Sequence, residues 1–161
     1  MIKALRLIYG WVNKLIELIC ILILLFLVVI TTQQVVMRFI FNRPASWAEE
    51  LSIILLIWFG YLGIIIGLRD GKHISISLMV NKFPEKAKKI VDILGRLLIA
   101  WFGLLMFQQG LQVVKLDAIN NMPATGIPAS YVSFVLVITG LLILIETVLK
   151  IFIPTTDILR K

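Results

Sequence analysis

The chain has 161 residues, of which 60% are hydrophobic and 16% are charged, and its mean hydropathy is +1.03. Soluble domains contain about 45–50% apolar residues, so this composition excludes a soluble globular protein and predicts an integral membrane protein. The formal net charge of +7 does not indicate a nucleic-acid partner, because the basic residues lie between apolar runs and not on one face of a soluble module.

Four apolar runs divide the chain, at about residues 15–36, 51–68, 90–114 and 130–148. A helix needs about 20 predominantly apolar residues to cross the hydrocarbon layer of a membrane. We therefore expect an all-α fold, with a single four-helix transmembrane domain over residues 1–161. Cys20 lies inside the first run and is expected to pack as a small hydrophobic residue.

The first run has the appearance of a secretory signal, because Lys3, Arg6 and Lys14 precede it. Such a signal ends in a small-residue cleavage site. Residues 30–36 offer no such site, so the run predicts an uncleaved signal-anchor helix.

The second run is uncharged and has a recognisable start. Ser46 and Glu49 have the spacing of a capping box, which predicts a helix that begins near Trp47. Gly63 and Gly67 are four residues apart, a spacing that allows close approach of another helix.

The other connections carry interfacial and turn signals. Residues 69–89 are polar with alternating apolar positions and end in a basic helical stretch, which predicts interfacial amphipathic segments. In the third run Asp92 and Arg96 are four residues apart on one helical face and can pair. Residues 115–129 are rich in Asn, Pro and Gly and predict a loop.

The distribution of positive charge predicts the orientation. The N-terminal tail has three Lys and Arg residues, the 69–89 connection six and the C-terminal tail three, whereas the two other connections together have three. Positively charged segments are retained in the cytoplasm, so both termini are expected there.

Few residues could carry chemistry. Glu17, Asp92, Arg96 and Glu146 lie within one or two turns of an expected helix end, where a side chain can reach the interface or pair, and no carboxylate lies near the middle of a span. His73 is the single histidine and cannot supply the ligands of a membrane haem or a metal site. We expect no enzyme activity, no cofactor and no metal.

The four tryptophans fall into two groups. Trp11 and Trp47 fit the aromatic belt at the membrane interface. Trp58 and Trp101 lie deeper, where the ring faces lipid or fills an interface with another protein, and the sequence leaves both alternatives open.

Several segments in a fixed order carry a family resemblance. They are Trp47–Ser52, Arg69–Ile74, Pro84–Lys86, and Met122–Pro128 leading to Tyr131. Together with the four expected spans, they make the chain resemble the small, Q-type (DctQ-like) membrane subunit of the tripartite ATP-independent periplasmic (TRAP) transporters.

The resemblance implies a bacterial inner-membrane protein that depends on partners. A periplasmic solute-binding protein would deliver an organic acid such as sialic acid or a C4-dicarboxylate. A large M-type membrane subunit, here a separate chain, would move it inward with sodium by an elevator motion. The small subunit would be a scaffold that anchors the large subunit among the membrane lipids.

The residues expected to contact a subunit or the membrane come from the matching segments and from the spans. They are Trp47, Glu49, Glu50, Trp58, Gly63, Arg69, Gly71, His73, Arg96, Trp101, Met122, Pro123, Gly126 and Pro128.

Two other functions are compatible with four spans in a short chain. A small multidrug exporter would need a membrane-embedded carboxylate in the first helix, where Glu17 lies too near the cytoplasmic end. The membrane anchor of a respiratory enzyme is disfavoured by the single histidine.

Overall fold

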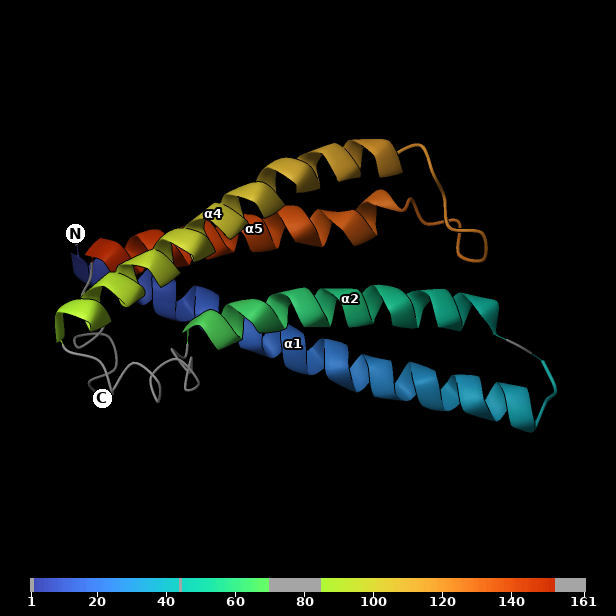
Figure 1. Cartoon of the computed structure of the whole chain (residues 1–161). Coiled ribbons are helices and arrows are strands. Elements are labelled where there is room, and N and C mark those ends of the chain that lie inside the picture. Colours follow the sequence, from blue (N-terminus) through green and yellow to red (C-terminus); the bar gives the residue numbers. More distant parts are fainter. Residues whose placement is uncertain (1, 44, 70–84, 153–161) are drawn as a thin grey trace.

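A computed structural model describes the backbone of residues 2–43, 45–69 and 85–152 and, within these ranges, the side chains of 9–43, 45–69, 90–91 and 93–149. The described part folds into four helices (Figure 1), namely α1 (Ile2–Phe39), α2 (Ser46–Arg69), α4 (Glu85–Asp117) and α5 (Ser130–Phe152). The expected all-α fold is therefore confirmed. The interfacial segments expected before residue 85, with Gly71 and His73, lie outside the described residues.

Each helix is long and apolar enough to cross a membrane. The qualifying stretches are Tyr9–Phe39, Ser46–Arg69, Ile93–Asp117 and Ser130–Leu149. At about 1.5 Å per residue even a 20-residue helix spans about 30 Å, the thickness of the hydrocarbon layer. α1 is much longer than its apolar run, because it continues from Ile2 to Phe39 over 38 residues.

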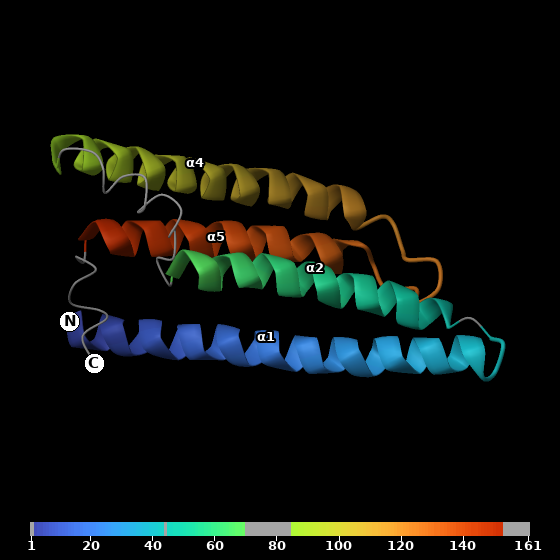
Figure 2. The same cartoon turned by 60° about the horizontal axis from the view of Figure 1, so that its bottom comes forward.

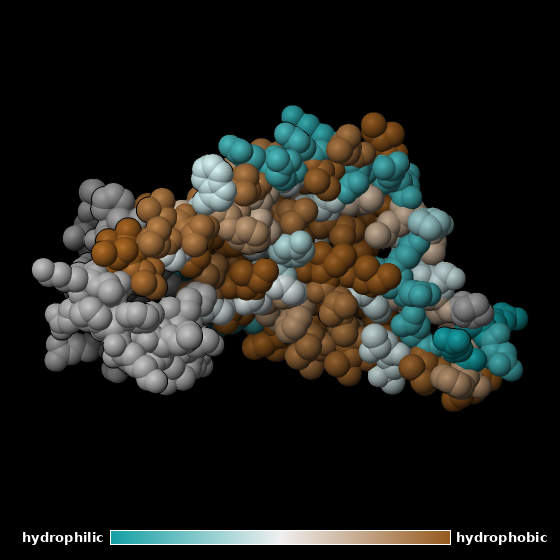
Figure 3. Space-filling view, viewed as in Figure 1, coloured by the Kyte–Doolittle hydropathy of each residue, from teal (hydrophilic) through white to brown (hydrophobic). Residues whose placement is uncertain are grey.

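The helices form an open row in the order α1, α2, α5, α4 (Figure 2), and contacts join α1 to α2, α2 to α5 and α5 to α4. Residues 40–43, which follow α1, and the loop at 118–129 lie together at one end of the row, which we call the loop end (Figures 1 and 2). The opposite end, where α1 begins and α2 ends, we call the terminal end. Figure 3 shows hydrophobic surface along the row and hydrophilic surface gathered at the loop end.

The closest helix packing joins α4 and α5 through glycines. A Cβ atom on Gly140 would lie 2.6 Å from the backbone nitrogen of Phe107, and one on Gly103 would lie 2.8 Å from Cγ2 of Ile143. By contrast, a Cβ on Gly63 or Gly67 would meet nothing within 4 Å. Within the described residues, two helices thus approach closely at Gly103 and Gly140, and not at Gly63 and Gly67, whose spacing suggested such a contact.

A small apolar core joins α1 and α2. It consists of Ile16, Cys20, Leu62 and Ile65, all nearly inaccessible. Cys20 is 5% exposed and packs as the small hydrophobic residue that was expected.

The ends of the helices differ slightly from the expected ones. α2 begins at Ser46, and the carbonyl of Ala45 accepts the N–H groups of Ala48 at 2.9 Å and Glu49 at 3.2 Å. Ala45, not Ser46, is thus the residue just before the first turn. α4 continues to Asp117, so the predicted loop is shorter at its start than expected. The side chain of Asp92, the expected partner of Arg96, lies outside the described residues.

Candidate functional site: polar contacts at the two ends of the row

The described residues contain no group of three or more His, Cys, Asp or Glu that could hold a metal ion. Their polar side chains instead join helices to one another at the two ends of the row.

Glu50 fixes the loop between α4 and α5. Its carboxylate accepts the backbone N–H groups of Ala124 and Thr125 and the hydroxyl of Thr125, each at 2.8 Å. Hydrogen bonds to an ionised group are shorter and stronger than those between neutral groups. Glu50 therefore attaches a loop more than seventy positions later to the beginning of α2.

The loop has a defined backbone of its own. Met122 donates its N–H to the carbonyl of Ile127 at 2.9 Å, and Gly126 donates to the carbonyl of Met122 at 2.9 Å. Gly126 has a φ of 71°, a left-handed conformation that glycine adopts without steric cost. An isolated antiparallel β-bridge between Asn121 and Pro128 closes the loop. Met122, Gly126 and Pro128 thus shape the loop that Glu50 holds.

Trp58 makes a further contact between helices. Its ring nitrogen donates to the carbonyl of Tyr131, at the start of α5, at 3.1 Å, and its half-buried ring packs against the core between α1 and α2. Trp101 is different, because its ring is 62% exposed on α4, the outer helix of the row. Close to the loop, the hydroxyl of Ser133 donates to the carboxylate of Asp117 and joins α5 to α4.

At the terminal end, two carboxylates take part in contacts that join α1 to α2 and, beyond α2 in the row, to α5. Glu17 forms an ion pair with Arg69 at the end of α2. Glu146, which is only 5% exposed on α5, accepts the hydroxyl of Tyr9 with distances of 2.7 and 2.8 Å to its two oxygens. Both carboxylates pair, as expected for acidic residues near helix ends.

The remaining predicted residues are distributed along the row. Trp47, Glu49 and Pro123 are exposed at the loop end, whereas Arg96 is half-buried on α4. The structure therefore brings Glu50 together with the 122–128 loop, and it leaves apart the other predicted residues that it describes.

Sequence reasoning missed several residues that hold the helices together. They are Tyr9, Gly103, Thr125, Tyr131 and Gly140. Thr125 lies in the Met122–Pro128 segment, where its hydroxyl beside Gly126 is a sequence signal for a hydrogen-bond donor in a turn. Tyr9 and Glu146 are 137 positions apart, so no local spacing could pair them.

An open row of four helices long and apolar enough to span a membrane, several of whose described polar groups join different helices, defines a multi-pass membrane protein. The family is clear from the sequence. The chain belongs to the tripartite ATP-independent periplasmic transporters as their DctQ component, whose pattern matches residues 27–154.

Individual relatives agree with this assignment. The chain is 30% identical over 149 residues to a TRAP transporter small permease protein of Haemophilus influenzae, with 88% of this chain and 92% of the relative covered. It is 27% identical to the sialic acid TRAP transporter small permease protein of Vibrio cholerae, with 88% and 82% covered. It is 35% identical over 66 residues to the sialic acid TRAP transporter permease protein of Haemophilus influenzae, with 41% of this chain and 11% of that protein covered.

The family fixes the general role and location. The chain is a multi-pass protein of the bacterial inner membrane, a small permease subunit of a transporter and not an enzyme.

Proposed function

We propose that this chain is the scaffold that holds a separate large membrane subunit of a TRAP transporter in the bilayer, with residues 1–161 acting as one transmembrane unit. A periplasmic binding protein delivers an organic acid, and the large subunit moves it inward with sodium. The names of two relatives support this substrate class, one being a sialic acid protein of Vibrio cholerae and the other a C4-dicarboxylate protein of Rhodobacter capsulatus.

An uncovered face of α2 is the observation that carries the proposal. The exposed positions of α2 below its first turn follow a seven-residue repeat, Ile53, Leu56, Gly60, Ile64 and Gly67. These positions share one side of the helix. α2 lies inside the row, yet none of the four described helices covers that side.

The glycines on this face leave room for a partner. A Cβ on Gly60, Gly63 or Gly67 would meet nothing within 4 Å. In lipid, helices associate where small residues let their backbones approach. The same chain packs α4 on α5 in that way at Gly103 and Gly140. A helix of the large subunit therefore fits on α2 in the middle of the row.

The match to the longer permease protein supports a partner of this kind. In that protein, a segment similar to this chain makes up 11% of a much larger polypeptide. In that relative, a segment similar to this chain is part of the same polypeptide as a longer permease sequence. A non-covalent complex of this chain with a large subunit would place the same two parts side by side. Family membership also favours this role over a multidrug exporter or a respiratory anchor.

The proposal divides the predicted residues into two groups. Glu50, Trp58 and the 122–128 loop act within the chain, where they fix its shape. Gly63 and Trp101 face away from the other helices and remain available to the large subunit or to lipid.

The test is recovery of the large subunit with variants of this chain in mild detergent. Gly60→Leu fills the uncovered face of α2 without an internal clash, so we expect recovery of the large subunit to fall about tenfold or more, because overpacking a close contact costs about 1–3 kcal/mol. The matched control is Gly10→Leu on α1, where a Cβ also meets nothing within 4 Å. Equal recovery with both variants, or altered solute selectivity with full recovery, would contradict the scaffold role on this face.

A further inference from the structure

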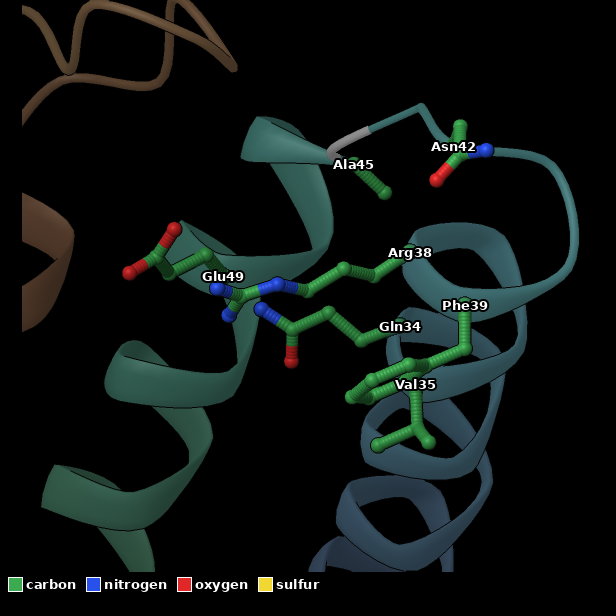
Figure 4. A pocket seen from close by; sticks show the side chains of 7 residues that line it. All are labelled: Gln34, Val35, Arg38, Phe39, Asn42, Ala45 and Glu49. Atoms are coloured by element: carbon green, nitrogen blue, oxygen red, sulfur yellow. The ribbon is translucent and has the colours of Figure 1, made fainter.

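A groove opens at the loop end between the last turns of α1 and the first turn of α2 (Figure 4). Its volume is about 590 Å³, and it is lined by Gln34, Val35, Arg38, Phe39, Asn42, Ala45 and Glu49. No part of the proposed scaffold role uses this groove.

One positive and one negative residue line the groove, Arg38 and Glu49; Glu49 lies at its α2 edge, with the carboxylate pointing away from α1 (Figure 4). Arg38 extends from α1 toward the first turn of α2, with the amide of Gln34 beside it (Figure 4). Among the described residues, no hydrogen bond or ion pair engages the side chain of Arg38 or of Glu49. The adjacent Glu50, by contrast, accepts three hydrogen bonds from Ala124 and Thr125. Glu49 therefore differs from Glu50 in having no structural contact of this kind.

The groove lies where hydrocarbon gives way to lipid headgroups. Arg38 is the first charged residue after an apolar stretch that crosses the membrane. Three large exposed apolar residues follow it, Phe39 at the end of α1 and Ile40 and Phe41 just after the helix, which are 76%, 70% and 60% accessible. Aromatic side chains beside a positive residue are typical of the membrane interface.

We propose that this groove binds the headgroup of an ethanolamine phospholipid. The guanidinium of Arg38 pairs with the phosphate, for which its forked donors are suited. The carboxylate of Glu49 accepts the N–H groups of the ammonium. The amides of Gln34 and Asn42 are polar partners for the phosphate and glycerol oxygens, and Val35 and Phe39 form an apolar wall for the start of the acyl chains.

The paired charges select this lipid class over others. A glycerol headgroup is anionic and would leave Glu49 without a cation. A choline headgroup carries a cation that has no N–H to donate. A water-exposed protein segment is a poorer match, because the apolar wall lies on the membrane side of the charges.

The experiment is native mass spectrometry of the purified full-length chain, titrated with phosphatidylethanolamine or phosphatidylglycerol of identical acyl chains. For the unchanged chain we expect one retained phosphatidylethanolamine and weaker retention of phosphatidylglycerol. Arg38→Gln should lower retention of both lipids, by about tenfold for one lost charge-assisted contact. Glu49→Gln should lower retention of phosphatidylethanolamine alone.

The matched control is Arg43→Gln, which removes a positive charge from the same turn but outside the groove. Circular dichroism of each variant verifies that the helices are intact. Equal retention by Arg38→Gln and Arg43→Gln, or a preference of the unchanged chain for phosphatidylglycerol, would overturn the proposal. So would loss of the large subunit from Arg38→Gln with lipid retention unchanged, since the groove would then hold protein. Because lipid retention and subunit recovery are read separately, failure here leaves the scaffold proposal standing.

Discussion

At the scale of single residues, neighbouring carboxylates on α2 have different tasks. Glu50 accepts three hydrogen bonds from the loop, whereas Glu49 accepts none from it. The difference comes from helix geometry, because adjacent residues point about 100° apart around the axis. One of them therefore faces the loop while the other lines the groove.

This difference predicts a selective loss of order in the loop. Glu50→Gln removes the charge that strengthens the three bonds, so the amides of Ala124 and Thr125 should exchange with solvent roughly tenfold faster. Hydrogen exchange with mass spectrometry of the 118–129 segment measures this. Glu49→Gln is the matched control and should leave exchange in the segment unchanged. Equal protection in both variants would mean that Glu50 does not hold the loop.

At the scale of elements, the two inner helices contribute in different ways. α5 has the largest buried share of the four spans, 44% against 11–17% for the others. It packs on α4 through backbone contact at Gly103 and Gly140 and on α2 at the opposite side. α2 has an open side, so α5 is the internal support of the row and α2 is its accessible surface.

The glycine contacts predict which substitutions separate the helices. Gly140→Ala places a Cβ against the backbone of Phe107, which cannot move as a side-chain tip can. Such overpacking costs about 1–3 kcal/mol, so the unfolding midpoint in detergent should fall. Gly67→Ala, in an open position of α2, should leave the midpoint unchanged or raise it slightly. A similar midpoint for both variants would show that α4 and α5 do not pack as closely as described.

At the scale of the whole molecule, the four described helices form an open row and not a closed bundle. α1 and α4 form its edges, and large apolar side chains cover the outside of α4, including Leu97, Leu98 and Trp101. Polar contacts at both ends fix the spacing of the helices. The helices therefore keep their arrangement and still expose a broad apolar surface to another membrane protein or to lipid.

The positive-inside distribution predicts the direction of the row in the membrane. A cysteine introduced at Pro123, in the loop, should react in intact cells with a maleimide that cannot cross the inner membrane. A cysteine introduced at Lys161 should react only after the membrane is permeabilised. The natural Cys20, buried between α1 and α2, should stay unlabelled in both experiments. The opposite labelling pattern would reverse the orientation.

The sequence alone determined the elements and the family. Long apolar runs admit only helices in lipid, because every backbone polar group must be satisfied within the segment. Local spacing located the start of α2 to within one residue and identified the 122–128 loop as a turn-rich segment. The ordered short motifs carried the resemblance that the family pattern confirmed.

Only the tertiary structure decided which helices pack against one another. Lipid is as apolar as the helix surfaces, so hydropathy does not specify which faces meet, and the choice rests on side-chain size and on polar partners. That is why the open order of the row, the packing at Gly140, the attachment of the loop to Glu50 and the pairing of Tyr9 with Glu146 could not be inferred from the chain. Each of these contacts joins residues that are distant in the sequence, and local sequence patterns do not specify contacts between distant residues.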